Sequence, residues 1–407
     1  MSSATRASGD TEFFAGIPVP VNPELIDREI SRLWKPLDSA QEGSEPAVTR
    51  ACLSNVIFYL PDSACCERAN DLVLAVGRRF PSRMILLLPL AGEEDLPRTG
   101  RLAAPSPSSA LDKRRAPPAP GMGEPASKCF KHGRAEHKQS ESRSSARGSR
   151  LSASITAVCH PSATGGSPVC CEQITLASAD RSLDVFPGAV SPLLVPDLPV
   201  NLVLLSDGGG QLVDMLSHVV DRVIFDSRRL EAAAVARVGA VASRWPRLAI
   251  DDVAWRDIVG WRMAVSEIFD DPKARSILSM VRSIKVCHVE GCSARAALLG
   301  GWLTSCLGRE SPFELEVEST RGEPGQVTSL RIDAGPGESG AYLAVRRVDG
   351  ARMLRIEYHT LEACVIPRTL RLRAESSAEL LGGALERTTH QGVLRAAVGQ
   401  AARWLSP

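Results

Sequence analysis

The chain is poor in aromatic side chains and in net charge. Phe, Trp and Tyr make up 4% of its 407 residues, with only three Tyr, and 48 Lys and Arg face 47 Asp and Glu. Platforms for single-stranded nucleic acids depend on aromatic side chains, and nucleic-acid binders carry a strongly basic face. The composition therefore argues against a dedicated nucleic-acid-binding protein.

The sequence also lacks a recognisable signal peptide and membrane span. The first ten residues are rich in Ser and Ala and contain no apolar core of the kind that secretion signals need. The longest weakly charged stretch, Phe186–Ser206, contains four prolines, which a spanning helix of about 20 residues does not accept together. We expect a cytoplasmic protein without membrane association.

Regular cysteine spacing is absent. Eleven cysteines, an odd number, are scattered irregularly, which fits a reducing compartment better than a disulfide framework. Two pairs, Cys65-Cys66 and Cys170-Cys171, are adjacent, and neighbouring Cα atoms about 3.8 Å apart are too close for an ordinary bridge. We therefore expect both pairs to be reduced and structural.

What the sequence does contain is an alternation of strands and helices in its first part. After a disordered tail over residues 1–22, a helix over Pro23–Trp34 precedes a buried strand over Ala51–Leu60. A helix that Asp62 can cap and a second apolar strand, Met84–Leu88, then complete a unit whose two strands should pair in parallel. Further strands and helices follow, so residues 23–280 are predicted to form an α/β domain.

A basic segment interrupts this domain. Between Arg98 and Arg150 there are 12 basic and four acidic residues with few large apolar ones. Such a segment cannot offset its ordering entropy, and we expect a disordered insertion over residues 98–150. A basic arm for nucleic acid is the alternative interpretation. Cys129, His132 and His137 have loosely zinc-like spacing, but no second cysteine pair accompanies them, so we expect no metal site.

The last part of the chain changes pattern. A strand over Ser283–Glu290 precedes a helix that begins after Ser293 and ends at Gly308. Several short strands and two terminal helices follow, which predicts an α+β domain over residues 281–407. The predicted fold is thus two-domain, an N-terminal α/β sheet domain followed by a C-terminal α+β domain.

Catalytic motifs are missing. The sequence has no nucleophile elbow, no Walker-type phosphate loop and no His-Glu-x-x-His motif. Cys287 and His288 are neighbours on a strand and point to opposite faces, which works against a shared site. The turn Gly208–Gly210 fits only two of the three glycines of a dinucleotide fingerprint, with Asp226 at the distance of a ribose-binding carboxylate. A nucleotide-binding enzyme that uses these residues is therefore an alternative function. The simpler interpretations are a tight turn at Gly208–Gly210 and a helix cap at Asp226.

Several longer motifs occur in an order that resembles the glucose-6-phosphate dehydrogenase assembly protein family, OpcA. They are Arg79–Arg83 (RFPSR), Val169–Leu176 (VCCEQITL), Pro192–Val200 (PLLVPDLPV), Asp221–Ser227 (DRVIFDS), Asp252–Asp270 with its two Trp, and Ala297–Gly308 (ALLGGWLTSCLG). The resemblance covers about Pro23 to Leu405. Phe80 stands where the family usually has His, and Val259-Gly260 replaces Thr-Pro before Trp261. The basic insertion has no family counterpart that we can match.

The resemblance implies a non-catalytic protein without a cofactor. Members of the family bind glucose-6-phosphate dehydrogenase, promote its active oligomer in the oxidative pentose phosphate pathway, and in photosynthetic bacteria couple it to redox state through thiols. On this chain, Cys170 and Cys171 are the candidate redox thiols.

The candidate partner-binding residues are Asp197, Trp255, Arg256, Trp261 and Arg262. Trp255 and Trp261 are six residues apart on one predicted helix, about 120° from each other, so at most one should be buried. Because interface anchors are enriched in Trp and Arg, the patch of Trp261 with the two arginines is preferred.

Overall fold

A computed structural model of the chain describes residues 14–15, 19–39, 49–90, 151–160, 168–206, 209–229, 233–308, 313–318, 322–335, 340–348, 351–359, 366–386 and 391–405. The chain divides into two units, one of Met1–Ala103 with Arg150–Pro407 and one of Ala104–Ser149. The second unit falls outside the described residues, as do residues 1–13 of the predicted tail and the predicted insertion over residues 98–150. The expectation of disorder is wrong for Phe14–Ala15 and Val19–Val21, since both segments pair with the strand Leu151–His160. The described helices and strands all belong to the first unit.

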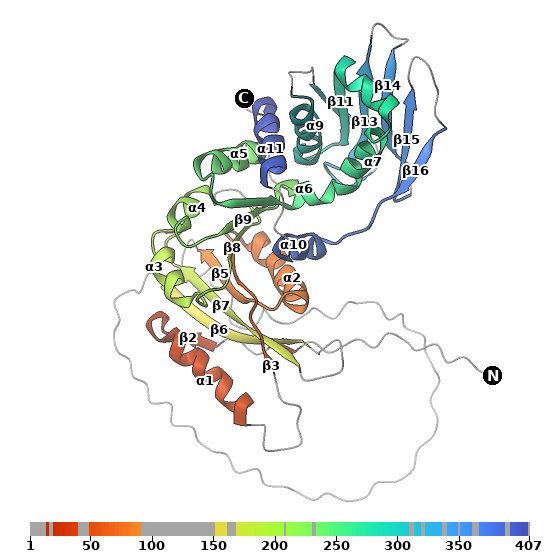
Figure 1. Ribbon diagram of the computed structural model, residues 1–407. Helices are drawn as coiled ribbons and strands as arrows, with labels where there is room; N and C mark the ends of the chain where they lie inside the picture. Colours follow the sequence, from red (N-terminus) through yellow and green to blue (C-terminus); the bar gives the residue numbers. More distant parts are fainter. Residues whose placement is uncertain are drawn as a thin grey trace, which may run out of the picture. The chain divides into compact units, whose positions relative to one another are not determined.

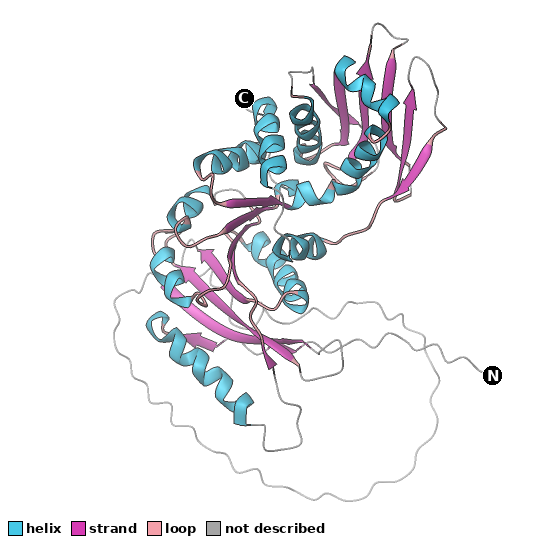
Figure 2. Ribbon diagram, in the orientation of Figure 1, coloured by secondary structure: helices cyan, strands magenta, loops and turns pink. Residues whose placement is uncertain are grey.

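The first sheet is mixed and mostly parallel (Figures 1 and 2). Its central order β6-β7-β5-β4-β8-β9-β10 is parallel from β7 to β10, while β6 runs antiparallel to β7. Its strands are β1 (Phe14–Ala15), β2 (Val19–Val21), β3 (Thr49–Arg50), β4 (Asn55–Tyr59), β5 (Arg83–Pro89), β6 (Leu151–His160), β7 (Val169–Ser178), β8 (Val200–Leu204), β9 (Arg222–Phe225) and β10 (Ala249–Asp252). The predicted parallel pairing of the first two long strands, β4 and β5, is confirmed.

Helices cover both faces of this sheet. Successive residues of a strand point to opposite faces, and the strand residues are apolar on both, so each face needs a covering layer. Val56 and Phe58 of β4 pack with α2 and α10, whereas Ile57 and Tyr59 belong to the core that contains α1, α3, α4 and α5. The helices that precede the second sheet in the chain are η1 (Pro23–Leu25), α1 (Ile26–Ser39), α2 (Ser63–Arg79), α3 (Phe186–Val190), η4 (Ser191–Leu193), α4 (Gly210–Leu216), η5 (Ser227–Arg229), α5 (Ala233–Arg244), α6 (Val253–Asp257), α7 (Val259–Phe269), α8 (Pro272–Ser276) and η6 (Ile277–Met280). Of these, α7 packs on strands of the second sheet.

The second sheet has the order β12-β11-β13-β14-β15-β16 and is antiparallel except for the pairing of β11 with β12. Its elements are β11 (Val281–Val289), α9 (Ala294–Leu307), β12 (Phe313–Glu318), β13 (Val327–Ala334), β14 (Ala341–Arg347), β15 (Met353–His359) and β16 (Arg368–Arg371), followed by α10 (Ser377–Glu386) and α11 (Gln391–Leu405). The predicted end of α9 is confirmed, since Gly308 adopts the left-handed conformation that favours glycine. The α/β and α+β classes are those expected from the sequence.

The two terminal helices pack on helices that lie far from them in the sequence. Helix α10 packs on α2 and α6, and Arg79 of α2 forms a two-point ion pair with Glu386, at 2.5 and 3.0 Å. Helix α11 packs on α5 and α9 so closely that a Cβ atom added at Gly301 would lie 2.3 Å from the carbonyl oxygen of Ala397. A glycine is therefore required at this helix crossing. The division of the chain after residue 280 stays a prediction.

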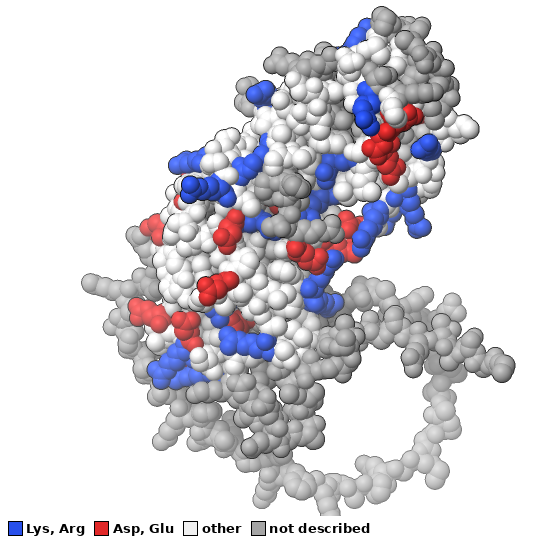
Figure 3. Space-filling view, in the orientation of Figure 1, with Lys and Arg blue, Asp and Glu red and all other residues white. Residues whose placement is uncertain are grey.

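Charged side chains of both signs lie side by side over the described surface visible in Figure 3. Several form ion pairs with close neighbours in the sequence, such as Arg32 with Glu29 and Arg355 with Glu357. Such exposed pairs contribute little to stability.

Candidate functional site

Three motifs that are far apart in the sequence meet at the amino ends of the parallel strands. Arg83 begins β5, Glu172 lies near the start of β7, and the loop from residue 191 to 199 leads into β8. Strand β4 lies between β5 and β8, and its first residue, Asn55, joins the loop to the sheet. We call the cavity at this edge the motif cavity; it is lined by residues 50–52, Arg83, 171–172 and 195–196, and its volume is about 390 Å³.

A buried ionic cluster forms one wall of the motif cavity. Arg83 donates through Nε to Glu172 Oε2 at 2.7 Å and places Nη2 at 2.6 Å from the same oxygen. The indole of Trp34, on α1, donates to Glu172 Oε1 at 2.8 Å, and Arg50 pairs with that oxygen as well. Arg83 and Glu172 are 9% and 5% exposed. Burial of this ion pair carries a desolvation penalty, which its hydrogen bonds and mutual attraction offset.

The loop that closes the cavity is held by specific hydrogen bonds. Arg83 donates through Nη1 to the carbonyl oxygen of Leu193 at 2.6 Å. The amide of Asn55 accepts from the N–H of Val195 at 2.8 Å and donates to its carbonyl oxygen at 3.0 Å. Asp197, at the outer end of this loop, has a φ of 63° and is exposed. Asp is among the residues that tolerate this left-handed conformation.

Two thiols also line the motif cavity. Burial raises the pKa of Cys52, and it raises the pKa of Cys171 to about 11. Cys52 accepts a hydrogen bond from the N–H of Arg83 at 3.3 Å, and Cys171 donates to the carbonyl oxygen of Val158 at 3.7 Å. Both thiols are therefore neutral at pH 7 and poor nucleophiles.

The expectation that Cys170 is reduced is wrong in this structure. Cys170 forms a disulfide with Cys159, which stands directly opposite it in the β6–β7 ladder. The short distance between neighbouring Cα atoms excludes only a bridge between Cys170 and Cys171. These two side chains point to opposite faces of β7, which leaves Cys170 free to pair with a cysteine on another strand. A role for Cys170 and Cys171 in redox control stays a prediction. The side chains of Cys65 and Cys66 lie outside the described residues.

The expectation that one of the two tryptophans is exposed is also wrong. Trp255 and Trp261 are 3% and 2% exposed. The helical-wheel argument assumed one continuous helix, but the backbone breaks at Ile258, so Trp255 lies on α6 and Trp261 on α7. Each helix therefore turns its own tryptophan into the core.

The two predicted contact arginines are engaged inside the protein. Arg262 lies over the ring of Trp255, 3.6 Å from its centroid, and donates to the carbonyl oxygen of that residue at 3.2 Å. Burial and the nearby Arg256 lower the pKa of Arg262 to about 10. Arg256 forms an ion pair with the fully buried Asp251. A partner contact through these residues stays a prediction; of the predicted contact residues, Asp197 is the exposed one.

At the alternative nucleotide site, the candidate ribose-binding carboxylate of Asp226 is engaged within the protein. Gly208 lies outside the described residues, and α4, which begins at Gly210, is short. Both carboxylate oxygens of Asp226 accept from Arg228, at 2.8 and 2.9 Å, and Asp226 is 6% exposed. A ribose hydroxyl would have to displace this pair.

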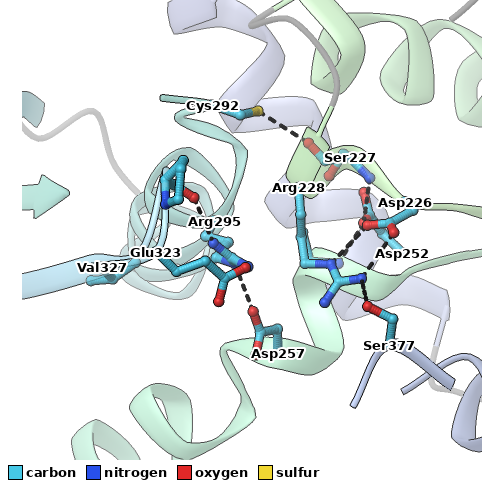
Figure 4. A network of polar contacts seen from close by, with 12 residues as sticks. Asp226, Ser227, Arg228, Asp252, Asp257, Cys292, Arg295, Glu323, Val327 and Ser377 are labelled. Carbon is cyan, nitrogen blue, oxygen red and sulfur yellow. Dashed lines mark hydrogen bonds and ion pairs between the residues drawn. The ribbon is translucent and has the colours of Figure 1, made fainter. Parts of the chain in front are cut away.

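The same residues belong to a polar network at the carboxyl ends of β9 and β10 (Figure 4). Arg228 donates to the hydroxyl of Ser377 at 2.9 Å, and the thiol of Cys292 donates to the carbonyl oxygen of Ser227 at 3.1 Å. Nearby, Arg295 pairs with Asp257 at 2.6 Å and with Glu323 at 2.7 Å. The network joins η5 and α6 to α9 and α10, and each charge in it has a partner of opposite sign or a hydrogen bond.

Asp252 is the most deeply buried acid of this network. Its Oδ1 accepts from the N–H of Ala254 at 2.8 Å and from the N–H of Ser227 at 3.3 Å. It is therefore the N-cap of α6. Desolvation, reinforced by Asp226, raises its pKa to about 7 against the smaller opposing effect of these hydrogen bonds.

Two further results concern the described residues only. Within them, no group of three or more His, Cys, Asp and Glu side chains is arranged to hold a metal ion. Cys129, His132 and His137 lie outside them. None of the helices in the described ranges combines the length and apolar character that a membrane crossing requires.

Comparison with known proteins identifies the family. Residues 131–240 match a family model described as the N-terminal domain of a glucose-6-phosphate dehydrogenase subunit, and residues 248–398 match one described as its C-terminal domain. The two models thus match the chain in the order of the N-terminal and C-terminal domains that they describe. The chain belongs to the OpcA family. The first match begins at residue 131, so the last part of the basic segment falls inside it, whereas the RFPSR motif lies before it.

Curated relatives agree with this assignment. OxPP cycle proteins OpcA of Nostoc punctiforme, Synechocystis sp. and Synechococcus elongatus are 29%, 27% and 28% identical over 155, 146 and 163 residues. These matches cover 37%, 34% and 39% of this chain and 33%, 30% and 36% of the relatives. The chain thus spans about a third of the length of the curated relatives it matches.

Solved structures give weaker likenesses. The oxidoreductase yhhX aligns over 86% of this chain and 95% of its own, with a TM-score of 0.39 and 7% identity. The WlbA dehydrogenase of Thermus thermophilus aligns over 87% and 95%, with a TM-score of 0.37 and 9% identity. At these scores the likenesses carry no argument about fold or function.

Proposed function

We propose that this chain is a non-catalytic subunit that binds glucose-6-phosphate dehydrogenase and activates it by promoting its active oligomer. The observation that carries the proposal is the pair of family matches, which cover residues 131–240 and 248–398 in the order of the two subunit domains. The relatives' name as OxPP cycle proteins supports a partner in the oxidative pentose phosphate pathway.

Polar side chains in and beside the shared motifs are engaged within the fold, which supports a non-catalytic role. Asp226 is held in a two-point pair with Arg228, and Asp251 is paired with Arg256. Cys171 is neutral at pH 7 because its pKa is raised to about 11. Their contacts thus serve the fold.

Physically, an activator of this kind binds the active oligomer more tightly than the inactive form of the enzyme. A shift of the enzyme from about 1:99 to 99:1 in favour of the active form requires about 5.5 kcal/mol of differential binding. A partial shift needs less, so a modest interface suffices for activation.

The test is to mix the purified chain with the purified cognate dehydrogenase at micromolar concentration. We expect co-elution in size-exclusion chromatography with light scattering, a larger enzyme oligomer, and a higher rate of NADP⁺ reduction. No complex and unchanged kcat and KM would exclude the proposal. The alternative, a nucleotide-binding enzyme, predicts that NAD⁺ or NADP⁺ raises the melting temperature of the chain alone.

The exposed Asp197 offers a way to locate the contact. Asp197→Asn removes the charge, and Asn tolerates a φ of 63° as well as Asp does. If the loop contacts the enzyme, this variant should weaken the complex, while the control Asp270→Asn, at an exposed position at the end of α7, should not. Equal affinity of both variants and the unmodified chain would remove Asp197 from the interface.

A further inference from the structure

The motif cavity is a concave site that the proposed function does not use. Its volume of about 390 Å³ falls within the range of small-molecule sites, about 300–1,000 Å³. It lies at the amino ends of β4, β5 and β7, the edge of the sheet opposite to the network of Figure 4. The charges on its wall decide which kind of molecule it fits.

The wall carries two guanidinium groups and one carboxylate. Arg50 and Arg83 face the single acid Glu172. Because the pKa of both Cys52 and Cys171 is raised, the thiols add no negative charge at pH 7. The lining residues therefore hold one surplus positive charge.

Arg83 and Glu172 have hydrogen-bond partners inside the protein. Arg83 binds one carboxylate oxygen through two nitrogen atoms and the carbonyl oxygen of Leu193 through the third. The other carboxylate oxygen already accepts from Trp34. The pair is complete and nine-tenths buried, and it needs no second arginine to neutralise it.

Arg50 is the surplus cation. Its side chain is 51% exposed, its Cζ lies 5.3 Å from the centroid of the Trp34 ring, and its Nη2 pairs with Glu172. A guanidinium has five N–H donors, so most of them remain for another acceptor. The cation–π contact with Trp34 and the ion pair orient the guanidinium at the cavity before any ligand arrives, which lowers the entropy cost of binding.

We propose that the motif cavity binds a small oxyanion, a phosphate- or carboxylate-bearing metabolite, through the guanidinium of Arg50. The planar fork of Arg50 matches two oxygens of either group. Arg83 stays paired with Glu172, so the surplus positive charge that meets the ligand is that of Arg50. The site belongs to this chain alone, so it does not depend on the partner enzyme.

The experiment is isothermal titration of the full chain with inorganic phosphate and with citrate, at constant ionic strength and pH 7.5. We expect saturable binding of one of the two probes, with one site per chain; which one binds separates the phosphate from the carboxylate source. In Arg50→Gln the affinity should fall at least tenfold. Arg50→Lys keeps the charge but loses the two-point geometry, and should lie between.

The matched control is Arg32→Gln, since Arg32 is equally exposed, at 55%, and pairs with Glu29 on α1. This control should bind like the unmodified chain. Circular dichroism melts of all three variants show whether they are folded, and because Arg50 is half exposed we expect them to be. Absence of saturable binding of both probes overturns the proposal, as does equal affinity in Arg50→Gln and Arg32→Gln. Neither result bears on the complex with the dehydrogenase.

Discussion

The buried carboxyl of Asp252 makes the stability of the protein depend on pH in a direction that can be worked out. Its pKa rises from an ordinary 3.8 to about 7 on folding, mainly through desolvation. Between these two pH values the folded state retains a proton that the unfolded state has released. The stabilisation is therefore complete below about pH 4, declines as the pH rises towards 7, and is lost above it.

A difference of about three pKa units corresponds to about 4 kcal/mol, at about 1.36 kcal/mol per unit, as an upper bound for this group. Asp252→Asn cannot ionise but keeps the side-chain oxygen that accepts from Ala254 and Ser227, so the N-cap of α6 survives. The new amide shifts stability by an amount that does not depend on pH. The variant should therefore gain stability relative to the unmodified chain as the pH rises from 5 to 8.

The assay is urea unfolding followed by circular dichroism at pH 5, 6, 7 and 8. The readout is the difference in unfolding free energy between Asp252→Asn and the unmodified chain, because other titrating groups cancel in it. We expect this difference to shift by about 2–3 kcal/mol in favour of the variant across the range. The exposed Asp270→Asn should show no such trend. A difference for Asp252→Asn that stays constant from pH 5 to 8 would refute the reasoning.

Three other changes test the packing by urea or thermal unfolding. Arg83→Met leaves the buried Glu172 with only the half-exposed Arg50 and the indole of Trp34 as partners and should cost about 3 kcal/mol, while a second change, Glu172→Met, should restore most of the loss; equal stability of the single and the double variant would contradict the buried ion pair. Gly301→Ala should destabilise the helix crossing by more than about 2 kcal/mol; in contrast Gly399→Ala, which meets no atom within 4 Å, should stabilise α11 by up to about 1 kcal/mol, and similar effects of the two would argue against the close approach. Cys159→Ser should lower the melting temperature under oxidising conditions and abolish any effect of dithiothreitol on it, since the bridge is gone; a persisting effect would point to another disulfide.

The pattern of elements was readable from local sequence. The apolar runs that became β4, β5, β7 and β8 are bounded by Pro, Gly and Asp, and a helix-period pattern separates β4 from β5, so the parallel α/β unit followed directly. Five strands were missed. Three of them, β1, β2 and β3, have only two or three residues, and β10 and β16 have four. Strand β10 also runs straight into α6, so its alternation could not be distinguished from a helix entry.

The sequence by itself also determined the family, because ordered motifs survive even where single residues change. It could not place those motifs together. The meeting of Arg83, Glu172 and Asn55 at one cavity depends on which strands pair, and strand order is set by contacts between distant residues. The same holds for the disulfide, since the register of β6 against β7 decides that Cys159 faces Cys170.

Burial was likewise decided by tertiary structure. A pattern of spacing assigned one of Trp255 and Trp261 to the surface, but a break of a single residue between α6 and α7 turned both indoles inward. Local sequence determines where elements form because propensity and periodicity act within a few residues. How those elements pack determines which side chains come into contact and which charged groups are desolvated. The motif cavity and the buried Asp252 both result from this packing.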